Sequence, residues 1–350
     1  MTTLADYDYK APFVYFGAKS AIADEVWRRF GNVPNYVEPF FGSGAILLHR
    51  PHEPGIETVN DADGLVCNAW RALRDAPDEV AKWGDMPAME NQLHAIHSWL
   101  VQRKDGLQSR LEGDVDWYDA RSAGYWLYGM ACWIGGEFCS GKGSWVVVDG
   151  ELVKRDKDAD ETGVKRQLLH LGTAGRGIQR KRLHLGDAGQ DDEEYSLRDY
   201  FYAIADRMKR VRVCCGDWVR VTGKSVTYCN GLTGAFLDPP YSAEAGRNNG
   251  CYRVESATVA HDVRAWCLEN GENPLLRIAI CGYADEGHDM LTEHGWNAYS
   301  WKTQGGYANR SDDEGSPGRK NSARETVWFS PHCIKPEPDS QQSLFRGDTP

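Results

Sequence analysis

Residues 35–44 read Asn-Tyr-Val-Glu-Pro-Phe-Phe-Gly-Ser-Gly, a short strand followed directly by a turn that contains two glycines. Residues 45–49 then read as the start of a helix. Gly42 and Gly44 let a ligand approach the backbone closely at the beginning of that helix. A tight strand-to-helix turn without any ligand is the simpler alternative, and the turn alone does not decide between the two.

The flanking segments alternate between helix and strand. Over residues 13–80 the order is helix, strand, helix, strand, helix, which predicts a parallel sheet with covering helices. The expected helices here are Ala23–Phe30, capped by Ser20, and Leu65–Leu73, and the expected second strand is Ile56–Asn60. Alternation returns late in the chain with strands at Val211–Cys215, Ala235–Leu237, Leu276–Cys281, Trp296–Trp301 and Glu325–Phe329, and a helix at Ala257–Leu268.

The middle of the chain has a different texture, so we expect residues 86–205 to form an inserted domain. Residues 1–85 and 206–333 then make the sheet-forming domain, and the polar residues 334–350 make a disordered tail. Within the insert, a helix is expected at Gln92–Leu100 and a strand at Trp145–Val148, and Ser122–Ile134 is an apolar stretch rich in Tyr and Trp. The aromatic run from Tyr125 to Tyr128 could offer a stacking platform, but core packing is the favoured interpretation.

Asp61 follows the second strand and strengthens the case for a ligand. A carboxylate at this point can accept hydrogen bonds from the hydroxyls of a ribose. Leu47 stands where a dinucleotide-binding turn would have its third glycine, which disfavours NAD. The sequence therefore predicts a cofactor that contains a nucleoside.

Asp238-Pro239-Pro240-Tyr241 comes directly after the apolar strand Ala235–Leu237. An exocyclic amine is a poor nucleophile, because its lone pair is delocalised into the ring, and catalysis needs acceptors for its two N–H groups. An aspartate and a backbone carbonyl fixed by proline can serve together, and Tyr241 can stack on a base. A proline turn with an Asp cap is the alternative without chemistry.

Together these stretches resemble the Dam-like adenine-specific DNA methyltransferases, phage-type members in particular. The resemblance covers about half of the chain, in the family's order: 13–19, 37–48, 60–61, 213–218, 237–241 and 324–329. Ala18 and Trp218 depart from it, since a second Gly and a Phe are common there. The resemblance implies a Rossmann-like class I methyltransferase sheet of about seven strands, S-adenosylmethionine as cofactor, and no metal.

The resemblance also implies roles for single residues. Tyr15 and Lys19 would contact the cofactor, with Lys19 near its methionine carboxylate. Asp217 would meet the cofactor's adenine amino group, with Trp218 against the ring. The residues implied to line the cofactor site are Tyr15, Lys19, Glu38, Phe40, Gly42, Gly44, Asp61, Asp217 and Trp218, and the residues implied to be catalytic are Asp238, Pro239, Pro240 and Tyr241.

The expected reaction is methylation of the adenine N6 amino group after the base is flipped out of the duplex. Asp238 and the Pro239 carbonyl would hold the amine. Methylation of the cytosine N4 amino group is one alternative, but that class usually has Ser where this chain has Asp238. A catalytically idle DNA-binding module is the other, and the intact Asp238 and Lys19 argue against it.

A net charge of -11 does not by itself suggest a nucleic-acid partner. A local basic patch can still bind double-stranded DNA, and residues 163–182 hold basic residues without any acidic one. The candidate DNA contacts there are Lys165, Arg166, Arg176, Arg180, Lys181 and Arg182. A solvated charged loop is the alternative.

Other features narrow the setting of the protein. There are ten cysteines without a C-x-x-C pair, which favours reduced thiols over a metal site. No apolar run approaches the ~18 residues that a membrane span needs, so we expect a cytoplasmic protein with no membrane partner. The segment Gln341–Phe345 resembles the short peptides that dock on bacterial sliding clamps, since a Gln is followed by the apolar pair Leu344-Phe345.

Overall fold

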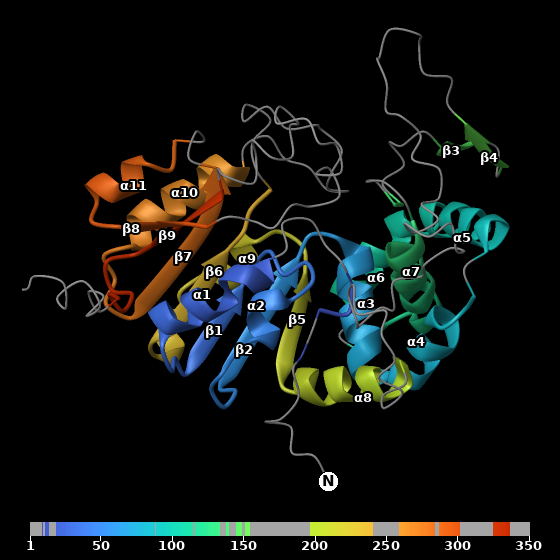
Figure 1. Cartoon of the computed structure of the whole chain (residues 1–350), viewed down its shortest axis with the longest axis horizontal. Coiled ribbons are helices and arrows are strands. Elements are labelled where there is room, and N and C mark those ends of the chain that lie inside the picture. Colours follow the sequence, from blue (N-terminus) through green and yellow to red (C-terminus); the bar gives the residue numbers. More distant parts are fainter. Residues whose placement is uncertain are drawn as a thin grey trace, which may run out of the picture.

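The computed structural model describes residues 9, 11–13, 19–87, 89–114, 116–133, 138–139, 145–148, 151–154, 197–240, 259–283, 287–301 and 325–336. A seven-stranded sheet lies at its centre, in the order β5-β2-β1-β6-β7-β9-β8 (Figure 1). The strands are β1 Asn35–Glu38, β2 Ile56–Asp61, β5 Val211–Cys215, β6 Thr233–Leu237, β7 Leu276–Tyr283, β8 Asn297–Ser300 and β9 Glu325–Phe329. Neighbouring strands from β5 to β7 are parallel, and β9 is antiparallel to both β7 and β8. The predicted Rossmann-like methyltransferase sheet of seven strands is confirmed.

The inner strands are buried on both faces, because both faces are covered. Every residue of β1, β6 and β9 is buried. Successive residues of β6 divide between two cores: Phe236 packs in a cluster with Trp27 and Trp70, whereas Leu237 packs with Val263 and other residues near β7. Burial on both faces explains why Ala235–Leu237 of β6 is a short apolar run without a polar side.

Helices connect and cover the strands. Those close to the sheet are α1 Ala23–Phe30, α2 Ala45–Leu48, α3 Gly64–Asp75, α9 Val219–Thr222, α10 Val259–Asn270 and α11 Met290–Glu293. Asp63 caps α3 by accepting a hydrogen bond from the Leu65 amide at 2.7 Å. The expectation that Ser20 caps the first helix is wrong, because residues 19–22 already form a 3-10 turn and Ile22 occupies the cap position.

A group of helices packs beside the sheet, next to its β5 edge (Figure 1). Its members are α4 Pro77–Gly84, α5 Glu90–Val101, α6 Lys104–Gly113, α7 Ala120–Cys132 and α8 Leu197–Met208. Trp126 and Tyr128 of α7 are buried in the same core as α3, which confirms core packing for the aromatic run. The two-stranded antiparallel sheet of β3 Trp145–Val148 and β4 Glu151–Lys154 follows α7 in the chain. None of the described helices combines the length and the apolarity that crossing a membrane requires.

Candidate active site

Four parallel strands end at the same edge of the sheet, and polar residues follow each of them. The turn 39–44 follows β1, Asp61 ends β2, Asp217 lies two residues after β5, and Asp238 follows β6. Because β1 lies between β2 and β6, its two neighbours are reached in opposite directions along the sheet. Ligands of open α/β sheets bind at such a switch point, beyond the carboxyl ends of the strands.

The glycine turn is held tightly against its surroundings. The Gly42 carbonyl accepts a hydrogen bond from Trp70 Nε1 at 2.9 Å, and Phe41 N donates to the Asn60 carbonyl at 2.9 Å. Gly44 has a φ of 68°, and a Cβ there would lie 2.7 Å from the Phe41 ring. Both the backbone conformation and the packing therefore require glycine at this position.

Asp61 and Asn60 fix the loops on either side of the turn. The Asp61 carboxylate accepts hydrogen bonds from the amides of Gly42 at 2.9 Å and Asp63 at 2.8 Å. Asn60 donates to the carbonyls of Pro39 at 3.1 Å and Gly216 at 3.0 Å, so it ties the loop after β1 to the loop after β5. Asp61 is half-buried, and a carboxylate can accept several hydrogen bonds.

Aromatic rings lie beside these loops. Phe40 and Trp218 stack at a centroid distance of 6.2 Å and an interplanar angle of 29°. Phe40 is only partly buried, and Asp217 is exposed with one carboxylate oxygen accepting from the Val219 amide at 2.9 Å. The structure thus brings the predicted ring contacts, Phe40 and Trp218, and the predicted acceptor, Asp217, into one region.

Glu38, the last residue of β1, is fully enclosed beneath the turn. Its Oε2 accepts a hydrogen bond from the Tyr36 hydroxyl at 2.8 Å. Burial raises the pKa of the Glu38 carboxyl well above its usual range, the hydrogen bond from Tyr36 opposes that shift, and the nearby Asp238 adds to it. Glu38 is therefore a carboxyl group that gains a proton more readily than one in water.

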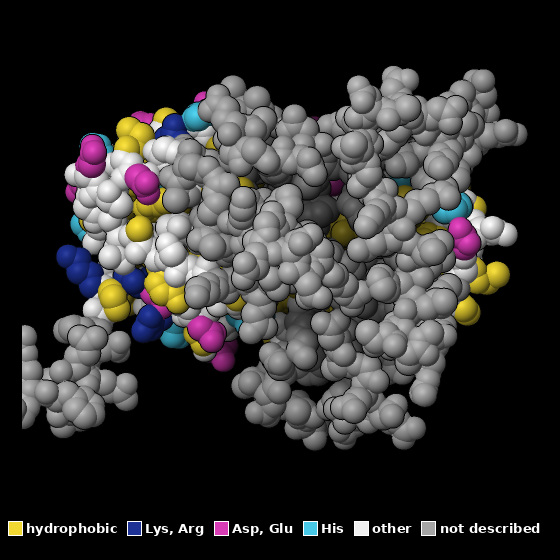
Figure 2. All heavy atoms as spheres, turned by 45° about the horizontal axis from the view of Figure 1, so that its top comes forward, with side chains coloured by type: hydrophobic (Ala, Val, Ile, Leu, Met, Phe, Trp, Pro, Cys, Tyr) yellow, Lys and Arg dark blue, Asp and Glu magenta, His cyan; other side chains and the backbone are white. Residues whose placement is uncertain are grey.

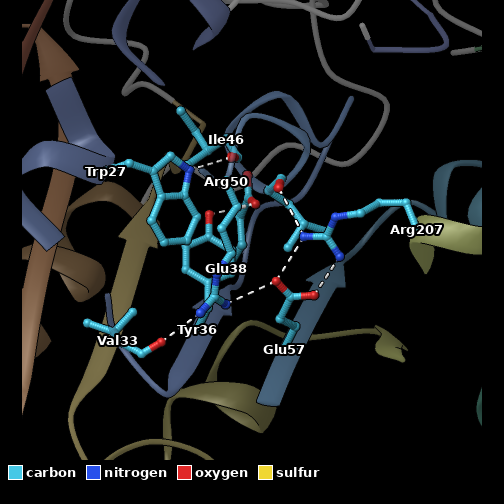
Figure 3. A network of polar contacts seen from close by, with 9 residues as sticks. Trp27, Val33, Tyr36, Glu38, Ile46, Arg50, Glu57 and Arg207 are labelled. Carbon is cyan, nitrogen blue, oxygen red and sulfur yellow. Dashed lines mark hydrogen bonds and ion pairs between the residues drawn. The ribbon is translucent and has the colours of Figure 1, made fainter. Parts of the chain in front are cut away.

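A buried ionic network lies at the start of β2 (Figure 3). Glu57 of β2 receives Arg50 at 3.0 Å and Arg207 of α8 at 2.7 Å, and the Glu57 side chain is completely buried. Arg207 also donates to the Leu47 carbonyl at 3.1 Å. The network joins the end of α2, the strand β2 and the helix α8. It therefore holds α2, the helix that follows the glycine turn, against the sheet.

Asp238 forms an ion pair that the sequence did not predict. Lys19 Nζ lies 3.1 Å from Asp238 Oδ1 and 4.0 Å from Glu325 Oε2. The side chains of Lys19 and Asp238 are 7% and 14% exposed, so water screens the pair only weakly. The predicted contact between Lys19 and the methionine carboxylate of a cofactor stays a prediction.

Several predicted residues lie outside the described part of the chain. They are Tyr15, Tyr241, the six basic residues Lys165, Arg166, Arg176, Arg180, Lys181 and Arg182, and the segment Gln341–Phe345. Within the described part, no group of three or more His, Cys, Asp or Glu residues is arranged to hold a metal ion.

Comparison with known proteins finds one similar family. The family model of the D12 class N6 adenine-specific DNA methyltransferases matches residues 15–94, which include the glycine turn, Asp61 and α3. Over these residues the chain is similar to that family. It is an adenine-specific DNA methyltransferase. No curated protein matches the chain.

The methyltransferase site contains groups that sequence reasoning missed. Asn60 was quoted in the resemblance but received no role, although it joins two loops of the site. Glu325 was likewise quoted in the resemblance and assigned to a strand without a role, yet it faces Lys19. Their positions near the end of β2 and at the start of β9 were visible in the sequence, but only the fold shows that both lie at the edge of the sheet that carries Asp61 and Asp238.

Proposed function

We propose that this methyltransferase transfers a methyl group from S-adenosylmethionine to the N6 amino group of adenine in double-stranded DNA. The observation that carries the proposal is the ion pair between Asp238 and Lys19, at the sheet edge where the glycine turn and Asp61 also lie. An anionic acceptor beside a nucleoside site is what methylation of an amine requires.

The residues after β1, β2 and β5 fit S-adenosylmethionine, which supplies an electrophilic methyl group when it is bound. The half-buried Asp61 carboxylate can accept from the ribose hydroxyls. The partly buried Phe40 offers a flat face for the adenine, next to Trp218. The exposed Asp217 can accept from the adenine amino group. These are the groups that a purine nucleoside needs.

Asp238 prepares the amine of the substrate base. Its carboxylate accepts a hydrogen bond from one N–H, and the Pro239 carbonyl accepts from the other, which draws the nitrogen toward tetrahedral geometry. The proton that leaves the methylated nitrogen moves to the Asp238 carboxylate. Positioning the amine against the donor supplies most of the rate, as for other reactions between two bound partners.

The adenine amino group is paired and stacked inside duplex DNA, so the base has to be flipped out before it can react. We propose that residues 86–205, in which α5, α6 and α7 lie, form the part that recognises the target sequence. The basic residues of 163–182 are the proposed phosphate contacts.

Product analysis tests this function directly. The enzyme is incubated with DNA and S-adenosylmethionine that carries a labelled methyl group, and the DNA is digested to nucleosides. Label in N6-methyladenine is the expected result. Label in N4-methylcytosine would replace the proposal with the cytosine alternative, and unlabelled DNA would refute methyl transfer.

Two variants separate the roles within the site. Asp238→Ala should abolish methyl transfer while calorimetric binding of S-adenosylmethionine persists, because Asp238 acts on the amine. Asp61→Ala should weaken cofactor binding about ten- to a hundredfold, the worth of a hydrogen bond to a charged group. The exposed Glu293 at the end of α11 gives the matched control Glu293→Gln, which should change neither quantity. A fully active Asp238→Ala enzyme would contradict the proposed mechanism.

A further inference from the structure

Lys19, from the first half of the chain, lies between two carboxylates that both come from the second half. Asp238 follows β6, and Glu325 is the first residue of β9, where it pairs in register with Tyr283 of β7. Both carboxylates approach the same ammonium group, at 3.1 Å and 4.0 Å. The shorter distance allows a hydrogen bond, whereas the longer one leaves only an electrostatic interaction.

Two buried polar atoms around this lysine have no hydrogen-bond partner among the described residues. One is an acceptor, Glu325 Oε2, and the other is a donor, Trp301 Nε1. The Trp301 ring lies 5.9 Å from Lys19 Nζ, and Glu325 and Trp301 are each 8% exposed. A buried carboxylate oxygen without a hydrogen bond costs stability, so its position calls for a functional account.

We propose that Glu325 is a positioning residue for methyl transfer, which shares Lys19 with Asp238 and thereby keeps Asp238 a strong acceptor for the adenine amine. The inference rests on the proposed role of Asp238. Glu325 acts through Lys19 and does not touch the substrate.

The physical argument concerns the charge at the amine. Lys19 alone would neutralise Asp238 and draw electron density from the oxygen that has to accept the N–H. The second carboxylate offsets the positive charge of Lys19, so the site keeps a net negative charge. Positive charge develops on the amine nitrogen as the methyl group is transferred, and a negative site stabilises it.

The charged and titratable groups around Glu325 set its pH dependence. Burial raises the pKa of the Glu325 carboxyl, Lys19 opposes the shift, and Asp238 adds to it. Cys281 of β7 feels the same groups together with Glu38, and burial raises the pKa of its thiol well above the usual range. The Asp238 interaction is mutual, so an ionised Glu325 also makes Asp238 more basic.

The test is the single-turnover rate of N6 methylation as a function of pH, for the wild-type enzyme and for Glu325→Gln. With one negative charge removed, Asp238 becomes less basic. The plateau rate should therefore fall by about tenfold, the ratio that one pKa unit represents. The acid limb of the profile should move to lower pH, because the negative charge that favoured protonation of Asp238 is gone. Glu325→Asp keeps the charge and should retain the wild-type limb.

Thermal unfolding supplies the readout that separates positioning from structure. Glu325→Gln removes a buried charge with an unpartnered oxygen, so its midpoint should equal or exceed that of the wild type, and Glu293→Gln serves as the exposed control. If Glu325→Gln keeps the wild-type rate and the wild-type acid limb of the pH profile, the inference is overturned. It is also overturned if the variant is slower and unfolds at a lower temperature while its acid limb stays in place. An inactive wild type would instead refute the proposed function, which the same assay shows before any variant is made.

Discussion

Glu38 and Glu57 are equally buried, at 2% exposure each, but they meet opposite surroundings. Glu57 faces the guanidinium groups of Arg50 and Arg207, which compensate its charge. Glu38 accepts from the neutral hydroxyl of Tyr36 and lies near Asp238. Two carboxylates on neighbouring strands therefore serve different purposes: one holds the scaffold, and the other is kept at the site at a cost to stability.

Glu38→Gln should show that cost as a function of pH. The folded-state pKa of Glu38 lies above the usual 4.5, so the folded protein keeps a proton that the unfolded chain loses. Stability therefore falls as pH rises from about 4.5 through the folded pKa, and a glutamine removes this loss. The variant's advantage in urea unfolding should grow as the pH rises above about 4.5. A difference that stays constant over this range would contradict the prediction.

At the scale of elements, α8 makes one buried ion pair with the sheet and one exposed ion pair with the helix α4. Arg207 near its end reaches the enclosed Glu57, whereas Arg198 near its start pairs with the exposed Asp78 of α4. Glu57→Gln should destabilise the protein by about 3 kcal/mol or more, because it leaves two buried arginines without their counter-charge. Asp78→Asn removes the exposed pair between α4 and α8. It should change stability little, because water screens exposed pairs. Denaturant unfolding of both variants makes the comparison, and equal losses would contradict it.

Elements whose apolar pattern is strong could be predicted from the sequence. Val211–Cys215 and Glu325–Phe329 have the predicted bounds, and Asp61 and Asp238 were found because they follow such strands. The helix α6 was missed because its ten residues include Gly106 and bury only Leu107 and Leu111. The pattern of such a segment is too weak to show a helix before its neighbours pack against it.

The helix α8 was missed for another reason. It follows a long charged stretch, and the expected domain boundary after residue 205 divides its buried residues: Tyr200, Phe201 and Ile204 were assigned to the insert, whereas Met208 was not. The ion pairs of Lys19 with Asp238 and Glu325 could not be predicted from the sequence. The three residues lie far apart in the chain, and the order of the strands in the sheet decides that they meet. Sequence reasoning found the ends of the strands but not which of their side chains meet.

For the whole molecule, the question is how a chain of net charge -11 binds DNA, which is also negatively charged. Both acidic and basic side chains appear on the part of the visible face that is described (Figure 2). Replacing Arg180, Lys181 and Arg182 together by Ala should weaken DNA binding and flatten its dependence on salt, because fewer counterions are released. Titrations at several salt concentrations measure both effects, with cofactor affinity as the unchanged control. Unchanged DNA affinity would favour the solvated-loop alternative.

The segment Gln341–Phe345 is a candidate binding site for a partner protein. We propose that it docks on a bacterial sliding clamp: Leu344 and Phe345 supply two adjacent apolar anchors, and Gln341 supplies hydrogen bonds. The residues around the apolar pair are polar, so a tail predicted to be disordered would give the anchors reach. Docking would tether the enzyme to newly copied DNA and raise its effective concentration there.

A peptide spanning residues 336–348 tests this partner by titration against the clamp of the host. Saturable binding at micromolar concentrations is expected, and it should be lost when Leu344 and Phe345 are both replaced by Ala, because the pocket then loses its apolar contacts. A Ser340→Ala peptide is the matched control and should bind as well as the parent. Undetectable binding at high micromolar clamp, or binding that survives the double replacement, would contradict docking. Either result would leave the methyl-transfer proposal unchanged. The proposed site is built from the residues at the ends of β1, β2, β5 and β6 together with Lys19 and Glu325, and not from this segment.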